Sequence, residues 1–78
     1  MKAFTDVFVY TNPECPRCKV VKTKLNDAGI SWHEITIDDK ILEYLDEEGF
    51  ATAPVLSVDG ELMDFSGALK FIEEMNRL

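Results

Sequence analysis

Apolar and polar positions follow two different periods in the first part of the chain, and each period predicts one element. The segment Ala3–Tyr10 is rich in β-branched and aromatic residues and precedes the turn-forming Thr11-Asn12-Pro13, so it predicts a largely buried strand. From Pro16 to Ala28 the apolar residues recur at every third or fourth position, which is the period of a helix that buries one face. Pro16 suits the first turn of this helix, and Gly29 suits its end.

The next segment alternates between apolar and polar residues and then changes to a helical period. The alternation over Ile30–Ile37 predicts a second strand. Asp38 or Asp39 can cap a helix that runs through Glu48 and is ended by Gly49. The predicted buried side of this helix carries Ile41, Leu42 and Leu45.

A hairpin and a final helix complete the pattern. Val55–Val58 and Glu61–Phe65 predict two strands joined by Asp59-Gly60, which is a strong signal for a two-residue hairpin turn. Ser66 is placed to cap the last helix. The predicted buried side of that helix carries Ala68, Phe71 or Ile72, Met75 and Leu78.

The order of these elements is βαβ, then a helix, a hairpin and a helix, which predicts an α/β fold. A βαβ unit forms a right-handed crossover between parallel strands, whereas the hairpin adds antiparallel pairing. We therefore expect a four-stranded mixed sheet with three helices on both faces, an arrangement that resembles a minimal thioredoxin-like fold. Because residues 1–78 contain no linker, repeat or low-complexity stretch, we expect a single domain.

Composition and charge narrow the possible functions. The chain has 78 residues with 8 basic and 15 acidic side chains, and its net charge of −7 has the wrong sign for a nucleic-acid-binding protein. No apolar run approaches the roughly 18 residues of a membrane-spanning helix, and Met1–Tyr10 lacks the hydrophobic core of a signal peptide. We therefore expect a cytoplasmic protein that binds neither nucleic acid nor membrane.

The two cysteines are the candidate chemistry. Cys15 and Cys18 lie at the junction between the first predicted strand and the first predicted helix. Side chains three residues apart on a helix are neighbours, so a disulfide can close between them. Free N–H groups and the helix dipole favour a thiolate at Cys15, whereas Cys18 falls on the buried face. The expected catalytic roles are attack by Cys15 and resolution by Cys18.

Two other interpretations of the cysteine pair stay open: a metal or iron–sulfur site shared by a dimer, and two inert thiols. A structural zinc site usually needs four ligands, and besides the cysteines this chain offers only the distant His33 among Cys and His residues. We therefore expect no metal ligand and no tightly bound cofactor. Redox chemistry through a reversible Cys15–Cys18 disulfide is the interpretation that we favour.

The charges are unevenly distributed along the chain. Half of the basic residues lie in the first predicted helix, whereas nine acids and one base fall between Asp38 and Asp64. A basic rim beside the cysteines can steer an anionic partner, although a solvated helix face is the simpler explanation for any single lysine. Arg17, between the cysteines, is the basic residue best placed to contact a substrate. Tyr10 can either flank the substrate groove or pack in the core.

Four motifs in a fixed order resemble the glutaredoxins. They are Tyr10-Thr11, Cys15-Pro16-Arg17-Cys18, Thr52-Ala53-Pro54 and Ser66-Gly67. The similarity extends over essentially the whole chain and is closest to the NrdH-redoxin branch, whose members supply electrons to ribonucleotide reductase. The resemblance implies a small dithiol–disulfide oxidoreductase that reduces protein disulfides, and we expect it to be a monomer.

The resemblance also implies which residues contact the substrate. Ala53-Pro54 would be a cis peptide bond facing the cysteines, which would let the backbone of Ala53 pair with an extended substrate segment. The substrate-binding residues implied in this way are Tyr10, Pro16, Arg17, Thr52, Ala53, Pro54, Ser66 and Gly67.

Two departures from the family pattern bear on the electron donor. Glutathione-using glutaredoxins usually have a basic residue three positions before the first cysteine, and this chain has Asn12 at that position. They also have acidic residues just after a pair of glycines. In this chain Ser66-Gly67 takes the place of that pair and is followed by Ala68, Leu69 and Lys70. Both departures favour recycling by thioredoxin reductase and NADPH. NrdH-redoxins, however, commonly have an aromatic residue at the position of Ala68. Recycling by glutathione therefore stays an alternative, and a dimeric iron–sulfur cluster carrier is a third.

Overall fold

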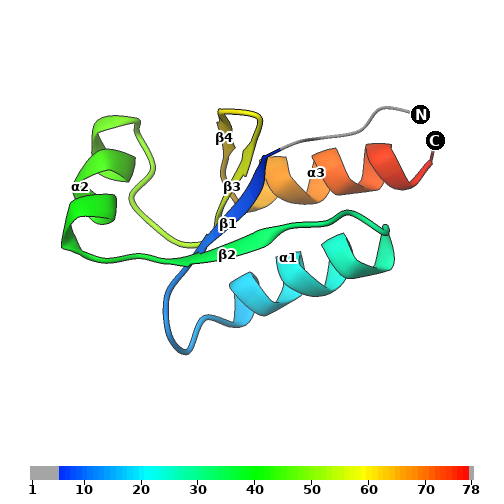
Figure 1. Ribbon diagram of the computed structural model, residues 1–78, viewed down its shortest axis with the longest axis horizontal. Helices are drawn as coiled ribbons and strands as arrows, with labels where there is room; N and C mark the ends of the chain where they lie inside the picture. The colour runs from blue at the N-terminus through cyan, green and yellow to red at the C-terminus, as the bar shows by residue number, and fades with distance from the viewer. Residues whose placement is uncertain (1–5, 78) are drawn as a thin grey trace.

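The computed structural model describes residues 6–77, which form four strands and three helices (Figure 1). In chain order they are β1 (Val7–Thr11), α1 (Pro16–Asp27), β2 (His33–Thr36), α2 (Asp39–Glu47), β3 (Val55–Val58), β4 (Glu61–Met63) and α3 (Phe65–Asn76). The predicted order of strands and helices is confirmed. Within residues 6–77, no helix is long enough and apolar enough to cross a membrane.

The strands form one mixed sheet in the order β2-β1-β3-β4. β1 runs parallel to β2 and antiparallel to β3, and β3 pairs in turn with β4. In the two central strands, Val9 stands opposite Leu56. The turn between β3 and β4 has a positive φ at Asp59 (49°) and at Gly60 (92°), which gives the turn a twist that matches the paired strands. The predicted mixed topology and hairpin are confirmed.

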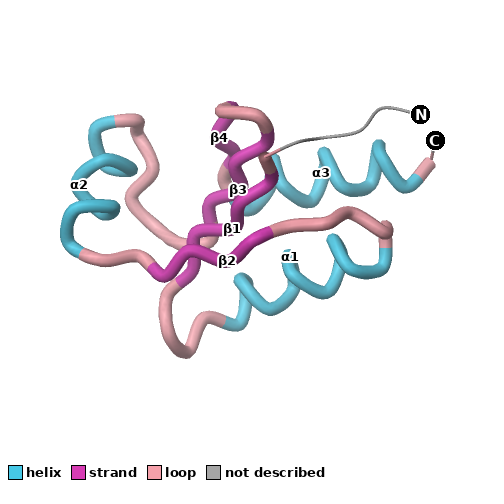
Figure 2. The backbone as a smooth tube through the Cα atoms, in the orientation of Figure 1, coloured by secondary structure: helices cyan, strands magenta, loops and turns pink. Residues whose placement is uncertain are grey.

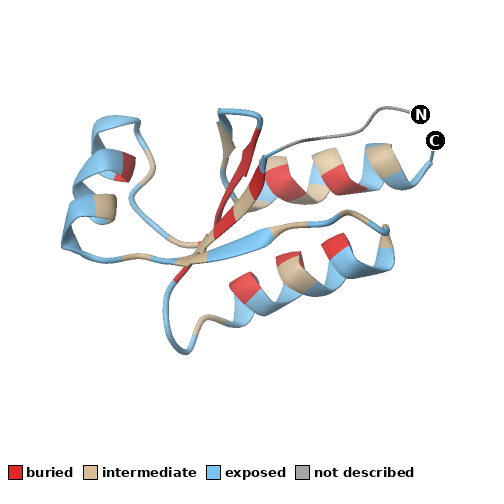
Figure 3. Cartoon of the chain, viewed as in Figure 1, coloured by how far each residue is buried: buried red, intermediate tan, exposed pale blue. Residues whose placement is uncertain are grey.

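Helices lie on both sides of this sheet. α1 and α3 pack against each other and against β1 and β3, while α2 lies on the other side (Figures 1 and 2). Along β1, Tyr10 points away from its neighbour Val9 and lies near Tyr44 of α2. Figure 3 shows the buried segments of α1 and α3 facing the strands. The main core is made of Val7, Val9, Val21, Leu25, Leu56, Val58, Ala68 and Ile72.

α2 is less buried than its sequence predicts. As predicted, Asp38 caps the helix, because its Oδ1 accepts the N–H of Ile41 at 2.8 Å, and Gly49 follows the helix with a φ of 90°. Leu45 is 1% exposed, but Ile41 is only half-buried and Leu42 is 48% exposed. The prediction for Leu42 is therefore wrong. This residue lies about 60° around the helix from Leu45, and Leu45 is the one residue of α2 that is buried.

The ends of the first two strands also differ from the prediction. β1 covers Val7–Thr11, and its burial alternates because successive side chains face α1 and α3 or the opposite side. Residues 3–5 of the predicted strand lie outside the described residues. The second strand is reduced to His33–Thr36. The N–H of Ile30 instead donates to the carbonyl of Leu25 at 3.0 Å, so this residue belongs to the turn that ends α1.

α3 is capped by Asp64 rather than by Ser66. Oδ1 of Asp64 accepts the N–H of Gly67 at 2.8 Å, which is the N-cap hydrogen bond of the helix. The predicted cap at Ser66 and the predicted strand end at Phe65 are therefore wrong, because an aspartate two residues earlier starts the helix and β4 ends at Met63. On the predicted buried side, Ala68 and Ile72 are buried and Phe71 and Met75 are half-buried, while Leu78 lies outside the described residues.

Candidate active site

Cys15 and Cys18 lie at the N-terminus of α1 and are joined by a disulfide, with their Cα atoms 5.2 Å apart. Cys15 is half-buried, whereas Cys18 is 1% exposed. The predicted burial of Cys18 is therefore confirmed, and Cys15 is the less buried of the two, although it is not fully exposed. In the described part of the chain, no group of three or more His, Cys, Asp or Glu side chains is arranged to hold a metal ion.

The surroundings of Cys15 favour a negative charge on its sulfur. Cys15 is the N-cap of α1, and its Sγ accepts the N–H of Cys18 at 3.1 Å. The helix has no acidic residue in its first turn. Its N-terminus carries the equivalent of about +0.5 elementary charge. In the reduced protein, the N–H of Cys18 and the helix dipole would favour a thiolate at Cys15, while the exposed carboxylate of the neighbouring Glu14 would oppose it.

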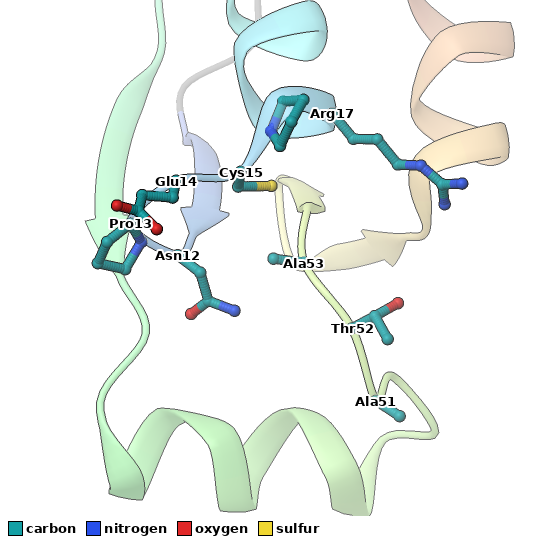
Figure 4. A pocket seen from close by; sticks show the side chains of 9 residues that line it. Asn12, Pro13, Glu14, Cys15, Arg17, Ala51, Thr52 and Ala53 are labelled. Carbon is teal, nitrogen blue, oxygen red and sulfur yellow. The ribbon is translucent and has the colours of Figure 1, made fainter.

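A pocket of about 500 Å³ opens beside the Cys15 sulfur (Figure 4). It lies between the loop that precedes α1 and the loop that precedes β3. In the second loop the Ala53-Pro54 bond is cis, as the glutaredoxin resemblance implied. The residues that line the pocket are Asn12, Pro13, Glu14, Cys15, Pro16, Arg17, Ala51, Thr52 and Ala53.

Half of the predicted site residues line this pocket, and the other five do not. Cys18 and Pro54 are buried next to the lining residues Arg17 and Ala53 in the chain. Tyr10, Ser66 and Gly67 do not line the pocket, so their role in substrate binding stays a prediction. Burial, and then the nearby Tyr44, raise the pKa of Tyr10.

Four lining residues were not among the predicted binding residues. They are Asn12, Pro13, Glu14 and Ala51. Each lies within three positions of a predicted residue in the chain, and for Pro13, Glu14 and Ala51 that proximity is the one sequence signal that could have identified them; Asn12 was also marked by the family pattern. Glu14 has a positive φ of 56°. Its residue type does not predict this left-handed conformation, because left-handed residues are usually glycine or asparagine.

The side chain of Arg17 is held against the start of α3. Its guanidinium carbon lies 5.3 Å from the centre of the Phe65 ring. A cation–π contact of this kind contributes about 0.5–1 kcal/mol at an exposed site. Figure 4 shows the side chain extending from α1 away from Cys15. No carboxylate of residues 6–77 forms a salt bridge with Arg17, so its charge is available to a bound molecule.

A charged network ties together the elements on either side of the cysteine loop. Oε2 of Glu34 in β2 accepts hydrogen bonds from Thr11 at the end of β1 (2.8 Å) and from Lys22 in α1 (2.6 Å). The hydrogen bond from Lys22, followed by the one from Thr11, lowers the pKa of Glu34. The loop that carries Cys15 therefore connects β1 and α1, and both of these elements donate a hydrogen bond to Glu34.

Known proteins share both the sequence pattern and the fold. The sequence model of the family described as Glutaredoxin matches residues 7–63. The curated protein named "Glutaredoxin-like protein NrdH" from Lactococcus lactis subsp. cremoris is 40% identical over 55 residues, which cover 68% of this chain and 76% of that protein.

Two solved structures show the same architecture. The glutaredoxin-like protein NrdH-redoxin from Escherichia coli superimposes with a TM-score of 0.75 at 24% identity, over 95% of each chain. Glutaredoxin from Brucella melitensis superimposes with a TM-score of 0.74 at 25% identity, over 94% of this chain and 83% of that chain. These likenesses show that the sheet and its three helices form a thioredoxin-like fold.

Proposed function

The chain belongs to the glutaredoxin family and is close to its NrdH members, and on this premise we propose that it reduces disulfide bonds of other proteins through Cys15 and Cys18. The family and the cysteine pair support thiol–disulfide oxidoreductase activity. The observation that supports different roles for the two cysteines is the difference in their accessibility. Cys15 lines the pocket at the helix N-terminus, whereas Cys18 is 1% exposed and cannot meet a large substrate directly.

The reaction begins with both cysteines reduced. The Cys15 thiolate attacks one sulfur of a substrate disulfide and forms a mixed disulfide, and the other substrate sulfur leaves as a thiolate that takes up a proton. Cys18 then loses its proton, attacks the Cys15 sulfur and displaces the second substrate thiol. Two electrons have then passed to the substrate, and the protein is left with the Cys15–Cys18 disulfide.

The shape of the pocket supports a protein segment as the substrate. Ala53 and Cys15 line it together, so an extended segment can pair with the main chain of Ala53 while its sulfur meets Cys15. In this arrangement Pro16, Arg17 and Thr52 contact the segment near its cysteine. The remaining predicted contacts, Tyr10, Pro54, Ser66 and Gly67, would support the loop or meet parts of the partner outside the pocket.

We further propose that thioredoxin reductase and NADPH restore the dithiol and that ribonucleotide reductase is the natural substrate. The similarity to the NrdH protein supports this choice. So does Asn12, because it lines the pocket where glutathione-using glutaredoxins usually carry a positive charge. Recycling by glutathione is the alternative. We place the activity in the cytoplasm, in a monomer of one domain that uses no tightly bound cofactor.

Two cysteine variants test this function. Cys15→Ser should lose the reduction of insulin disulfides by dithiothreitol-recycled protein. Cys18→Ser should accumulate a mixed disulfide between Cys15 and the substrate, visible as an added mass that dithiothreitol removes. Lys24→Ala is the control, because this residue lies in the last turn of α1 and outside the pocket. Full activity of Cys15→Ser would contradict the proposal.

A further inference from the structure

We propose that Glu14 and Arg17 select substrate peptides by the order of the charges that flank the reacting cysteine, in the direction that main-chain pairing with Ala53 sets. Glu14 binds a basic residue on one side of the reacting cysteine, and Arg17 binds an acidic residue on the other side. The inference rests on the proposed function, because it concerns how the same pocket selects among protein disulfides.

The pocket changes the sign of its charge across the reacting sulfur. Of the nine residues that line it, Glu14 and Arg17 are the two with charged side chains. Figure 4 shows Glu14 on one side of Cys15, together with Asn12 and Pro13, and Arg17 reaching out on the opposite side. A molecule bound at Cys15 therefore meets a negative group in one direction and a positive group in the other.

Arg17 is held by a side-chain contact, whereas Glu14 is oriented only by its backbone, and both charges are free to bind. The Phe65 ring fixes the guanidinium of Arg17 toward α3, with 5.3 Å between guanidinium carbon and ring centre. The left-handed backbone of Glu14, with a φ of 56°, sets the direction in which its side chain leaves the loop. Both residues are exposed, and neither forms a salt bridge within residues 6–77. The fold thus presents two opposite charges, without salt bridges in the described part of the chain, on opposite sides of Cys15.

When pairing with Ala53 sets the direction of an extended substrate segment, this polarity becomes a preference for one order of charges along the segment. With its cysteine at Cys15, such a segment runs out of the pocket on two sides. If its acidic flank lies at Arg17 and its basic flank at Glu14, it gains two attractive contacts. The same segment with its charges exchanged meets two repulsive contacts, and juxtaposed like charges discriminate between partners. The chemistry of the selected substrate is therefore a cysteine with an acid on one flank and a base on the other.

Two isomeric peptides test this inference. Acetyl-Lys-Gly-Cys-Gly-Asp-amide and acetyl-Asp-Gly-Cys-Gly-Lys-amide have the same composition and no net charge, so the overall charge of the protein attracts both equally. Each is supplied as its mixed disulfide with 2-thiopyridine, which is uncharged. Attack of reduced Cys15 on the peptide sulfur releases pyridine-2-thione, and Cys18 then releases the peptide thiol. Because each reduced protein molecule reacts once, the rate of pyridine-2-thione release with the peptide in excess gives the second-order rate constant for each isomer.

We expect this rate constant to differ by about fivefold between the isomers at low ionic strength, as expected for two exposed charge contacts. The difference should shrink in about 1 M salt, where screening acts within about 3 Å. The double variant Glu14→Arg/Arg17→Glu has the same net charge as the wild type and should prefer the other isomer. Lys24→Glu makes the same charge change as Arg17→Glu at the far end of α1, and it should keep the wild-type preference.

The possible results separate the two proposals. Equal rates for the two isomers in the wild type would overturn the inference about charge order and leave the disulfide-reducing function standing. Absence of pyridine-2-thione release from either isomer would overturn the proposed function itself. If the double variant does not fold, the single variants Glu14→Gln and Arg17→Gln decide the question, because each should reduce the preference. An unchanged preference in both would refute the inference.

Discussion

The backbone N–H of Cys18 donates a hydrogen bond to the Sγ of Cys15 at 3.1 Å. In the proposed function the buried cysteine would serve its partner in two ways: its thiol would resolve the mixed disulfide, and its main-chain N–H would stabilise a thiolate at Cys15. Because the donor belongs to the backbone, it does not depend on the Cys18 side chain. The two roles of this position can thus be separated by substitution.

The variant Cys18→Ala should keep a reactive Cys15. The N–H of residue 18 and the helix N-terminus remain, so at pH 7 the variant should react with iodoacetamide about fivefold faster than free cysteine, which is mostly protonated there. Mass spectrometry at timed intervals measures the reaction. The matched variant Cys15→Ala leaves only Cys18, which is 1% exposed and should react only after denaturation. Equal, slow labelling of both variants would show that the helix N-terminus does not activate Cys15.

The hydrogen bond between Asp64 and Gly67 should account for most of the capping of α3. Asp64→Ala should lower the free energy of unfolding by about 1 kcal/mol, because the first turn of the helix loses an N–H partner. Ser66→Ala, two residues later on the exposed surface, should change it by less than about 0.5 kcal/mol. Urea unfolding followed by circular dichroism measures both. If Ser66→Ala lowered the free energy of unfolding more than Asp64→Ala did, Ser66 would be the cap, as the sequence predicted.

This cap also shows where the sequence fails as a guide to the fold. Most element ends were predictable because a local signal marks them, as Pro16 marks the start of α1 and Gly49 the end of α2. Asp64 and Ser66 both have the chemistry of a cap, and the length of β4 decides between them. The predicted burial of Leu42 is wrong for a different reason. Helical period gives the direction of a buried face, but not how much of that face the sheet covers.

The candidate site was predictable to a similar degree. The cysteine pair and the Thr52-Ala53-Pro54 loop follow from short motifs, and the structure brings Cys15, Thr52 and Ala53 into one pocket. The contact between Arg17 and Phe65 joins two elements that are far apart in the chain, so no local sequence pattern could predict it. The same holds for Glu34, whose two hydrogen-bond donors come from β1 and α1.

Glu34 should make the stability of the protein depend on pH. Its pKa in the folded state lies below the ordinary value of 4.5, so its contribution is present above that value and is lost as the pH falls through the lowered pKa. Glu34→Gln should therefore lower the free energy of unfolding near neutral pH. The difference from the wild type should shrink in acid. Urea unfolding across the pH range measures both effects.

A matched variant separates this network from the general effect of removing an acid. Glu43→Gln changes an exposed residue of α2 in the same chemical way. It should leave the free energy of unfolding nearly unchanged at neutral pH. If Glu34→Gln and Glu43→Gln behaved alike at every pH, the hydrogen bonds from Thr11 and Lys22 would contribute nothing measurable.

The electron donor can be identified by comparing two recycling systems at equal protein concentration. With an insulin substrate, NADPH oxidation should be rapid with thioredoxin reductase and slow with glutathione and glutathione reductase. The reason is the absence of a basic residue at Asn12 and of acids after Ser66-Gly67, which in glutathione-using relatives hold the two ends of glutathione. The reverse result would assign the protein to the glutathione-using glutaredoxins without changing its chemistry.

Asn12→Lys should increase the use of glutathione. Asn12 lines the pocket beside Cys15, so a lysine there would place a positive charge within reach of a glutathione carboxylate. An exposed pair of this kind contributes about 0.2–1 kcal/mol, so the rate with glutathione should rise by up to about fivefold and the gain should fall with added salt. Asn12→Gln, which lengthens the side chain without a charge, is the control and should show no such gain. If lysine and glutamine had the same effect, the charge at this position would not decide between the two electron donors, and the choice would have to be made by the surface of the reductase instead.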